Sequence, residues 1–325
     1  MTQQEILNTQ QTKTWKIQQL LSLGLTRNEV AILMNVGYGF VQNIFAQQYP
    51  DRIRHNRARF REAIEGLILT NFVFNHTFGV EIEAYGCPKD RLVRELTEAG
   101  INVYNAGYTH DTTPQWKIVR DSSISGNNPF ELVSPKLNGL HGLEELRKVS
   151  AVLKRLNVKI NKSCGLHIHF DASEFSKETW LRIFKNYAKL ELIIDSFMPH
   201  SRRANNQRYC KSVRVTNFAN KLQYIKNRGL DLESTLRSIK SSIAHNSRYS
   251  KINVESYWRH QSVEFRQHSG TIEIEKMENW ILFLARLIEF SKTNEVQRED
   301  WNALQGFLTE EQIAYFKQRT ERLSN

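Results

Sequence analysis

The chain has 325 residues, of which 40% are hydrophobic, so it can bury a core large enough for one large domain and a small one. No apolar run approaches the ~20 residues that a membrane span requires, and the polar first residues lack the apolar stretch of a secretory signal. These features exclude a membrane protein and favour a folded cytoplasmic one. Cys87, Cys164 and Cys210 are few and widely spaced, which indicates reduced thiols rather than disulfides or a zinc cluster.

Most of the net charge of +11 lies in one segment. Residues 200–260 contain 13 Lys or Arg and 3 Asp or Glu, which is an excess of 13 − 3 = 10 positive charges. Such a segment can bind phosphates or an acidic substrate, can lie along a nucleic-acid backbone, or can be a solvated surface. The composition leaves these three interpretations open.

The first 62 residues predict a small helical module. Apolar spacing indicates three short helices within 11–48, and Thr26 is placed to cap the second of them. The second and third helices are joined by a tight turn around 35–37, a layout that resembles the DNA-binding helix-turn-helix family.

The third helix of this module offers polar groups but no positive charge. Tyr38, Gln42 and Asn43 are its candidate contacts, whereas the basic residues gather at 51–61. Any three-helix bundle shows apolar spacing of this kind. Contact with DNA or RNA and a purely structural or protein-binding bundle therefore both stay open.

Three distant stretches, 78–86, 164–171 and 262–271, alternate apolar side chains with acidic or imidazole ones. A period of two is that of a β-strand, whose successive side chains point to opposite faces. A fourth segment, 127–135, places an acid between two apolar residues in the same way. The functional groups expected on one face are Glu81, Glu83, Glu131, His167, His169, Asp171, Glu264, Arg266 and His268.

Apolar stripes at helical spacing predict three long amphipathic helices within 140–156, 180–197 and 277–288. Such helices cover the apolar face of a sheet and leave the polar face open as a trough. The expected fold class is therefore α+β with a largely antiparallel sheet.

The polar face is too charged to be buried without partners, because gathered carboxylates repel one another and resist desolvation. Divalent metal ions would both reduce the repulsion between the carboxylates and stabilise them away from water. Two such ions would need roughly the hard oxygen ligands and the one imidazole present here, which are Glu81, Glu83, Glu131, Glu264 and His167. Arg266 follows Glu264 on the same face and would point at an anion held by those ions.

The order of these motifs resembles the amidoligase family of the glutamine synthetase and glutamate–cysteine ligase fold. The motifs are an ExE strand, then ELVSP, GLHIHFD and VEFRQHSGT, with SRRANNQRYC at 201–210 between the last two. The likeness covers about residues 77–290. It implies a curved, largely antiparallel sheet of glutamine synthetase type in an amidoligase-like domain at 77–292. The residue patterns divide the rest of the chain into a helical module at 1–62, a connector at 63–76 and a helical extension at 293–325.

The resemblance also implies a reaction, the ATP-dependent ligation of a carboxylate to an amine. Phosphorylation of the carboxylate gives an acyl phosphate, and Mg²⁺ or Mn²⁺ serves as the cofactor that spreads the phosphate charge. By position in the motifs, the ligands of the ion that bridges the ATP phosphates are Glu81, His167 and Glu264. Those of a second ion near the substrate are Glu83 and Glu131, and Asp121 is a candidate for a third acid there.

The same resemblance assigns the remaining polar residues. His169 would hydrogen-bond the nucleotide, and Arg266 would bind the carboxylate or the transferring phosphoryl group. Arg202 and Arg203 are candidates for the phosphates or an acidic substrate, with surface charges as the alternative. His268 would contact the nucleotide or orient Glu264. The base that accepts the proton of the amine is not identified.

Substrate identity and oligomeric state are left open by the sequence. Related ligases join amino acids, peptides, polyamines or modified bases, and the N-terminal module would direct the enzyme to DNA or a partner. Two other functions suit the same residues. The first is a nucleic-acid-binding regulator whose larger domain senses a nucleotide, and the second is a metal-dependent nuclease, which needs no ATP.

Overall fold

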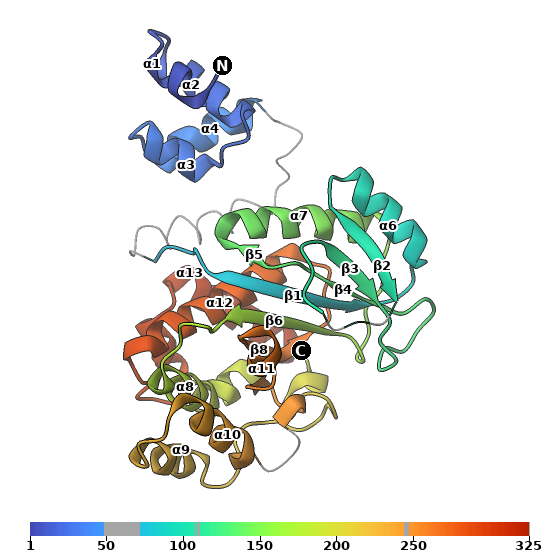
Figure 1. Cartoon of the computed structure of the whole chain (residues 1–325), viewed down its shortest axis with the longest axis vertical. Coiled ribbons are helices and arrows are strands. Elements are labelled where there is room, and N and C mark those ends of the chain that lie inside the picture. The colour runs from blue at the N-terminus through green and yellow to red at the C-terminus, as the bar shows by residue number, and fades with distance from the viewer. Residues whose placement is uncertain (49–71, 108, 110, 244–246, 325) are drawn as a thin grey trace. The chain divides into compact units, whose positions relative to one another are not determined.

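The computed structural model describes residues 1–48, 72–107, 109, 111–243 and 247–324 (Figure 1). The chain divides into two compact units, Met1–Asn71 and Phe72–Asn325. The predicted basic cluster at 51–61 and most of the predicted connector at 63–76 lie outside the described residues. The predicted amidoligase-like domain at 77–292 and the predicted helical extension at 293–325 both belong to the second unit.

The described residues of the first unit, 1–48, form four helices, one more than the sequence predicted. They are α1 (Gln3–Asn8), α2 (Lys13–Ser22), α3 (Arg27–Leu33) and α4 (Tyr38–Gln48). Threonine side chains cap three of them, and the caps of α1 and α3 are reciprocal, because a glutamate three residues on accepts from the threonine N–H. The buried core that these helices share is Ile6, Ile17, Leu20, Leu21, Val30, Ala31, Val41 and Ile44.

Helices α3 and α4 form the predicted helix pair, but its polar surface differs from the prediction. Gln42 is buried and accepts a hydrogen bond of 2.9 Å from Arg27 Nη1, so it is not free to read a ligand. Asn43 is exposed, and the neighbouring surface carries the apolar side chains of Ile32 and Phe40, which are 71% and 46% exposed. Nucleic-acid contact by this unit stays a prediction.

The second unit is built on one open, mostly antiparallel sheet. Its strands are β1 (Thr77–Ala84), β2 (Val103–Gly107), β3 (Trp116–Val119), β4 (Phe130–Val133), β5 (Leu137–Asn138), β6 (Gly165–Asp171), β7 (Ile252–Asn253) and β8 (Ser262–Ser269). Their order is β2-β3-β4-β1-β6-β8-β7, with β5 paired to β1, and the only parallel pair among the described strands is β2 with β3. The predicted α+β class with a largely antiparallel sheet is confirmed at this level.

The described helices of the second unit are α6 (Lys89–Glu98), α7 (Gly139–Arg155), α8 (Lys177–Ser196), α9 (Phe218–Asn227), α10 (Leu232–Ser242), α11 (Tyr257–His260), α12 (Ile274–Thr293) and α13 (Glu310–Ser324), with short 3₁₀ turns at His200–Arg202, Ser247–Tyr249 and Trp301–Gly306. Three of them, α7, α8 and α12, agree with the predicted amphipathic stripes. No helix in the described parts of the chain joins the length and the apolar character that a membrane crossing demands.

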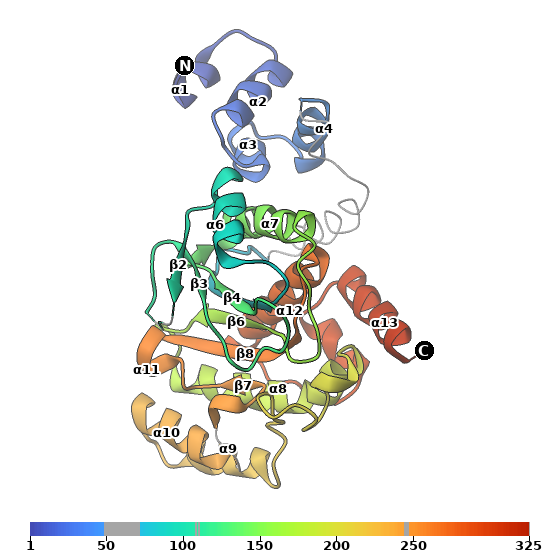
Figure 2. The ribbon, with the colours of Figure 1, turned by 90° about the vertical axis from the view of Figure 1, so that its right-hand side faces the viewer.

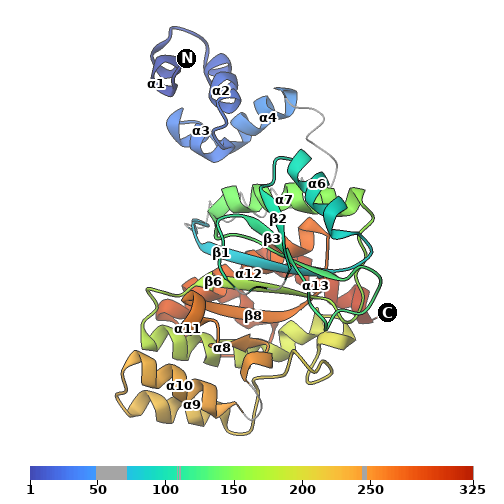
Figure 3. The same ribbon diagram turned by 45° about the vertical axis from the view of Figure 1, so that its right-hand side comes forward.

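One face of the sheet is covered by helices, and this fixes where the polar face lies. Helix α12 runs behind β1 and β6 in the views of Figures 1 and 3. The apolar side chains that face it are almost completely buried, including Val80, Ile82 and Ile168 at no more than 1% exposure. Since side chains alternate along a strand, the opposite face carries the acids and imidazoles.

The C-terminal extension packs on the same covered side. Figure 2 shows α12 and α13 together on one side of the strands. Phe316 of α13 lies 4.4 Å from Phe197, centroid to centroid, and also contacts Phe283 of α12. The extension therefore completes the core of the second unit and adds nothing to the polar face.

Candidate active site

Three carboxylates meet on the open face where β1 and β4 pair. Glu83 lies directly opposite Glu131 in the antiparallel register, and Glu81 is two residues before Glu83 on the same face. Glu83 is held by the N–H of Gly165, which donates to its Oε2 at 2.5 Å. A β-carbon at Gly165 would lie 2.7 Å from His167 Nε2, so this glycine gives the imidazole its room.

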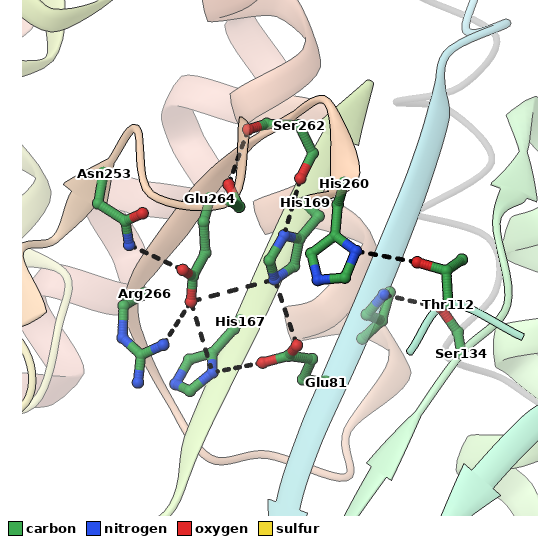
Figure 4. Close-up of polar contacts among 12 residues, drawn as sticks. Glu81, Thr112, Ser134, His167, His169, Asn253, His260, Ser262, Glu264 and Arg266 are labelled. Atoms are coloured by element: carbon green, nitrogen blue, oxygen red, sulfur yellow. Dashed lines mark hydrogen bonds and ion pairs between the residues drawn. The ribbon is translucent and has the colours of Figure 1, made fainter. Parts of the chain in front are cut away.

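Strand β6 brings the two imidazoles beside these acids. His167 is paired across the strands with Glu81, and its Nδ1 lies 2.9 Å from Glu81 Oε2, while its Nε2 lies 3.5 Å from Glu83 Oε1. His169 Nδ1 contacts Ser262 Oγ at 3.2 Å. His169 Nε2 lies 3.3 Å from Glu81 Oε1 and 4.0 Å from Glu264 Oε1, within ion-pair distance of both carboxylates (Figure 4).

Strand β8 adds the fourth carboxylate and the arginine. Glu264 lies opposite His169 in the register, and its Oε1 accepts from Arg266 Nη1 (Figure 4). Its Oε2 accepts from Asn253 Nδ2 at 2.7 Å. Asn253, on the two-residue strand β7, is fully buried, and no pattern in the sequence predicts it. Both partners hold Glu264 in one orientation.

These side chains form two groups whose ligand atoms lie within 4.8 Å of one another, Glu81–His167–Glu264 and Glu83–Glu131–His167. Carboxylate oxygens with one imidazole suit Mg²⁺ or Mn²⁺. The buried Nε2 of His169 faces Glu81 and Glu264 of the first group and can donate to an anionic ligand placed there. The residues present therefore fit a divalent metal ion with an anion bound beside it. The first group has the residues that the resemblance implied, whereas the second adds His167 to Glu83 and Glu131 and does not include Asp121.

The electrostatic surroundings keep the first group ionised. Burial raises the pKa of Glu81, but the neighbouring His169 and His167 outweigh burial and hold that pKa well below its usual value. Burial acts in the same sense on Glu264, and Arg266 together with His169 brings its pKa below the usual value. An ionised carboxylate is the form that binds metal.

Glu131 differs from the other acids. Burial, and then the charges of Glu81, Glu83 and Asp121, raise its pKa well above the usual value. Three carboxylates that share a small buried volume without enough positive charge favour protonation of one of them. A cation bound between Glu83 and Glu131 would remove this repulsion.

A lysine that the sequence pattern does not predict also faces the trough. Lys117 of β3 is paired with Val133, on the face that carries Glu131, and is only 4% exposed. Its Nζ donates to the carbonyl oxygen of Asp111 at 2.5 Å, and burial lowers its pKa. It sits in the run Trp116–Val119, which is buried throughout, so period-two alternation gave no signal.

The two arginines predicted from the 201–210 segment differ in position. Arg203 donates to the carbonyl oxygen of Met198 at 2.8 Å and thereby ties its own loop. Arg202 is buried, its Nη2 donates to the carbonyl oxygen of Cys164 at 2.5 Å, and its Nε has no hydrogen-bond partner. Arg202 Nη2 lies close to Glu83 and His167, since atoms of all three would touch a β-carbon added at Gly165.

The predicted placement of His268 on the polar face is wrong. The register of β8 against β6 shifts between Phe265 and His268, which inserts an extra residue and turns the later side chains over. His268 consequently lies on the helix-covered face, 5.8 Å from Trp280 between ring centroids. It cannot reach a nucleotide in the trough or orient Glu264.

Two cavities lie along the open face and share Glu81, Glu131 and His169. The smaller, of about 130 Å³, is lined by Gly79, Ser134 and Asp171, and the larger, of about 740 Å³, reaches Asp121, Tyr209 and Arg248. A β-carbon at Gly79 would make only ordinary contacts, at 3.7 Å or more, so the glycine leaves the floor of the smaller cavity open. The trough thus has a narrow end and a wide end, and both carboxylate groups line the wide end.

An open antiparallel sheet that gathers two carboxylate–imidazole groups and an arginine beside a large cavity is typical of an enzyme active site. Comparison with protein families identifies the class. The model of the family described as "Putative amidoligase enzyme" matches residues 75–288, so the chain belongs to the amidoligase family. Comparison with curated proteins finds no match. Family membership places the chain among ligase-type enzymes.

Changing Asn253 tests how the site holds Glu264. Asn253→Asp replaces the donor to Glu264 Oε2 by a second carboxylate, so we expect Mn²⁺ affinity to fall by about 10–100-fold, with a smaller loss for Asn253→Ala. Mn²⁺ titration followed by electron paramagnetic resonance measures the affinity. The exposed Asn227→Asp variant adds the same charge and should bind Mn²⁺ as the unaltered chain does. Equal affinities in all four proteins would remove the role given to Asn253.

Proposed function

We propose that this amidoligase joins a carboxylate to an amine at the expense of ATP, through an acyl phosphate, and that its sheet is of the glutamine synthetase type. The observation that carries the proposal is the division of the acids into two groups around His167, with Arg266 directly beside the first. Two ions held side by side suit a reaction in which a phosphoryl group passes between two oxygen atoms.

The narrow cavity is the proposed nucleotide end. It is lined by Glu81 and Glu131, and His169, Ser134 and Asp171 supply hydrogen-bonding atoms there. The wide cavity is lined by the residues of both metal-binding groups and by Arg266, and it is the proposed place for the carboxylate and the amine. Its size suits acceptors larger than ammonia, such as amino acids, peptides or polyamines.

The chain's own groups have separate tasks in this scheme. When bound, Mg²⁺ or Mn²⁺ would supply positive charge to the phosphate oxygens, and Glu81, His167 and Glu264 with Glu83 and Glu131 would hold it. Arg266, whose pKa the adjacent Glu264 and Glu81 raise against the effect of burial, stays charged and can bind the carboxylate or the transferring phosphoryl group. Lys117 brings a second positive charge from the opposite wall of the trough.

The deciding experiment follows both the nucleotide and the oxygen atoms. The full chain is incubated with Mg²⁺, ATP and a pool of the twenty amino acids labelled with ¹⁸O in their carboxylates, with putrescine or hydroxylamine as the acceptor. We expect amide or hydroxamate together with ADP, and ¹⁸O in the released phosphate, because the acyl oxygen leaves with phosphorus. AMP with pyrophosphate would contradict the acyl phosphate, and no ATP-dependent product would contradict ligation.

Two other functions would give different results in the same assay. ATP binding without turnover would favour a nucleotide-sensing regulator, and cleavage of DNA without ATP would favour a nuclease. The carboxylate-to-amine reaction accounts for more of the site, because a sensor needs neither both carboxylate groups nor Arg266. We propose that the first unit directs the enzyme to DNA or to a protein partner.

A further inference from the structure

Six carboxylate side chains line the wide cavity, and the structure gives five of them a partner or a ligand role. Glu81, Glu83, Glu131 and Glu264 belong to the two metal-binding groups. Glu255 accepts hydrogen bonds from Ser247 Oγ and from Lys240 Nζ, the latter at 2.9 Å. The sixth is Asp121, which belongs to neither group and has no Lys, Arg or His of the described residues within ion-pair distance.

Asp121 lies at the wide end of the trough, just after β3. Val119 of β3 is opposite Glu131 in the register, and Asp121 follows two residues later, so it lies one step beyond Glu131 in the direction away from the nucleotide end. The N–H of Ser123 donates to its Oδ1 at 2.7 Å, which fixes the side chain in a tight turn. Its charge is near enough to contribute to the raised pKa of Glu131, after burial and the charges of Glu81 and Glu83.

The geometry points to a chemical task for this carboxylate. Resting on the function proposed above, we propose that Asp121 is the catalytic base of the ligation and binds the incoming ammonium group in the wide cavity. A fixed, half-buried carboxylate with one oxygen uncommitted is suited to hold a cation beside the activated carbonyl. The four metal-binding acids cannot serve in this way while they bind metal, and Glu255 is neutralised by Lys240.

Asp121 accepts one proton from the ammonium group of the acceptor, and the nitrogen lone pair released in this way attacks the carbonyl carbon of the acyl phosphate. The C–N bond forms, the bond between that carbon and the phosphate oxygen breaks, and its electron pair leaves with the phosphate. The second nitrogen proton departs with the phosphate, which yields the amide and hydrogen phosphate.

Acceptors that differ in protonation test this role. Putrescine is protonated at pH 7, whereas hydroxylamine is neutral and needs no base before it attacks. With the amino-acid pool as donors, we expect Asp121→Asn to lower kcat with putrescine by about 100-fold or more and kcat with hydroxylamine by less than about threefold. Mn²⁺ affinity, measured by electron paramagnetic resonance, should be unchanged, since Asp121 is not one of the ligands.

Glu255→Gln is the matched control, because it removes one carboxylate charge from the same cavity. It should lower both rates alike and only slightly. Equal loss with the two acceptors in Asp121→Asn, or a Mn²⁺ affinity that falls with it, would overturn the assignment and favour a positioning or ligand role. If the unaltered chain forms neither product, the proposed ligase function fails, and the inference falls with it.

Discussion

Replacing Glu264 by glutamine should reduce ATP turnover by at least about 1,000-fold and weaken Mn²⁺ binding by about 100-fold. Glu264 supplies a ligand atom to the first group, accepts from Arg266 and is fixed by Asn253, so one substitution disturbs three contacts. Glutamine keeps the size of the side chain but loses its charge, which leaves Arg266 without its closest anion. Coupled-enzyme assay of ADP release and Mn²⁺ titration measure the two effects.

Two further variants test whether the effect is specific to the first metal-binding group. Glu81→Gln removes a second ligand of the same group and should give a loss of similar size, whereas Glu83→Gln should weaken a separate Mn²⁺ site. Glu273→Gln is the control, since its carboxylate follows the same strand but is about half exposed and pairs with Lys154 at 2.5 Å. Normal ATP turnover by Glu264→Gln and Glu81→Gln in a folded protein would disprove the site.

The strands that carry the site could be predicted because each has one buried face. The stretches 164–171 and 262–271 agree with β6 and β8 to within two residues, since apolar groups must alternate with polar ones in a half-covered sheet. Alternation does not say which strands are neighbours. Their pairing, which sets Glu81 opposite His167 and His169 opposite Glu264, depends on contacts across more than 80 residues, and only the resemblance to a family suggested it.

The residues that the sequence placed wrongly, or did not predict, also have local structural explanations. His268 was placed on the wrong face because a bulge adds one residue to β8. The alternation of side chains in the sequence does not reveal such an inserted residue. Asn253 was missed because a strand of two residues has no period, and Lys117 because its strand is buried on both faces. The resemblance implied that Arg202 and Arg203 bind the phosphates or an acidic substrate. Both bond to backbone carbonyls, and Arg202 also lies close to Glu83.

Replacing Lys251 by methionine should cost about 3–5 kcal/mol in the free energy of unfolding, because it leaves two buried carboxylates without a cation. Lys251 is fully buried, and its Nζ lies 2.9 Å from Glu191 Oε1 and 2.6 Å from Asp195 Oδ1, both on α8. For a unit of this size the loss corresponds to a fall in Tm of roughly 6–20 °C. Thermal unfolding followed by circular dichroism measures it.

This buried ion network also connects α8 to the strand that carries the site. Asp195 Oδ1 accepts from Gln267 Nε2 at 2.5 Å, and Gln267 is the neighbour of Arg266, whose N–H donates to the carbonyl oxygen of Lys251 at 2.8 Å. Loss of the ammonium group should therefore lower ATP turnover as well, by releasing β8 next to Arg266. A stability loss without any change in turnover would separate the network from the site.

Lys154→Met is the matched control for the stability effect, because Lys154 and Glu273 form an ion pair of similar length at the surface and should contribute less than about 1 kcal/mol. A triple variant, Lys251→Met with Glu191→Gln and Asp195→Asn, removes the uncompensated charges and should recover much of the loss. If Lys251→Met unfolds at the same temperature as Lys154→Met, the buried charges are compensated in another way, and Lys251 does not hold β8 in place.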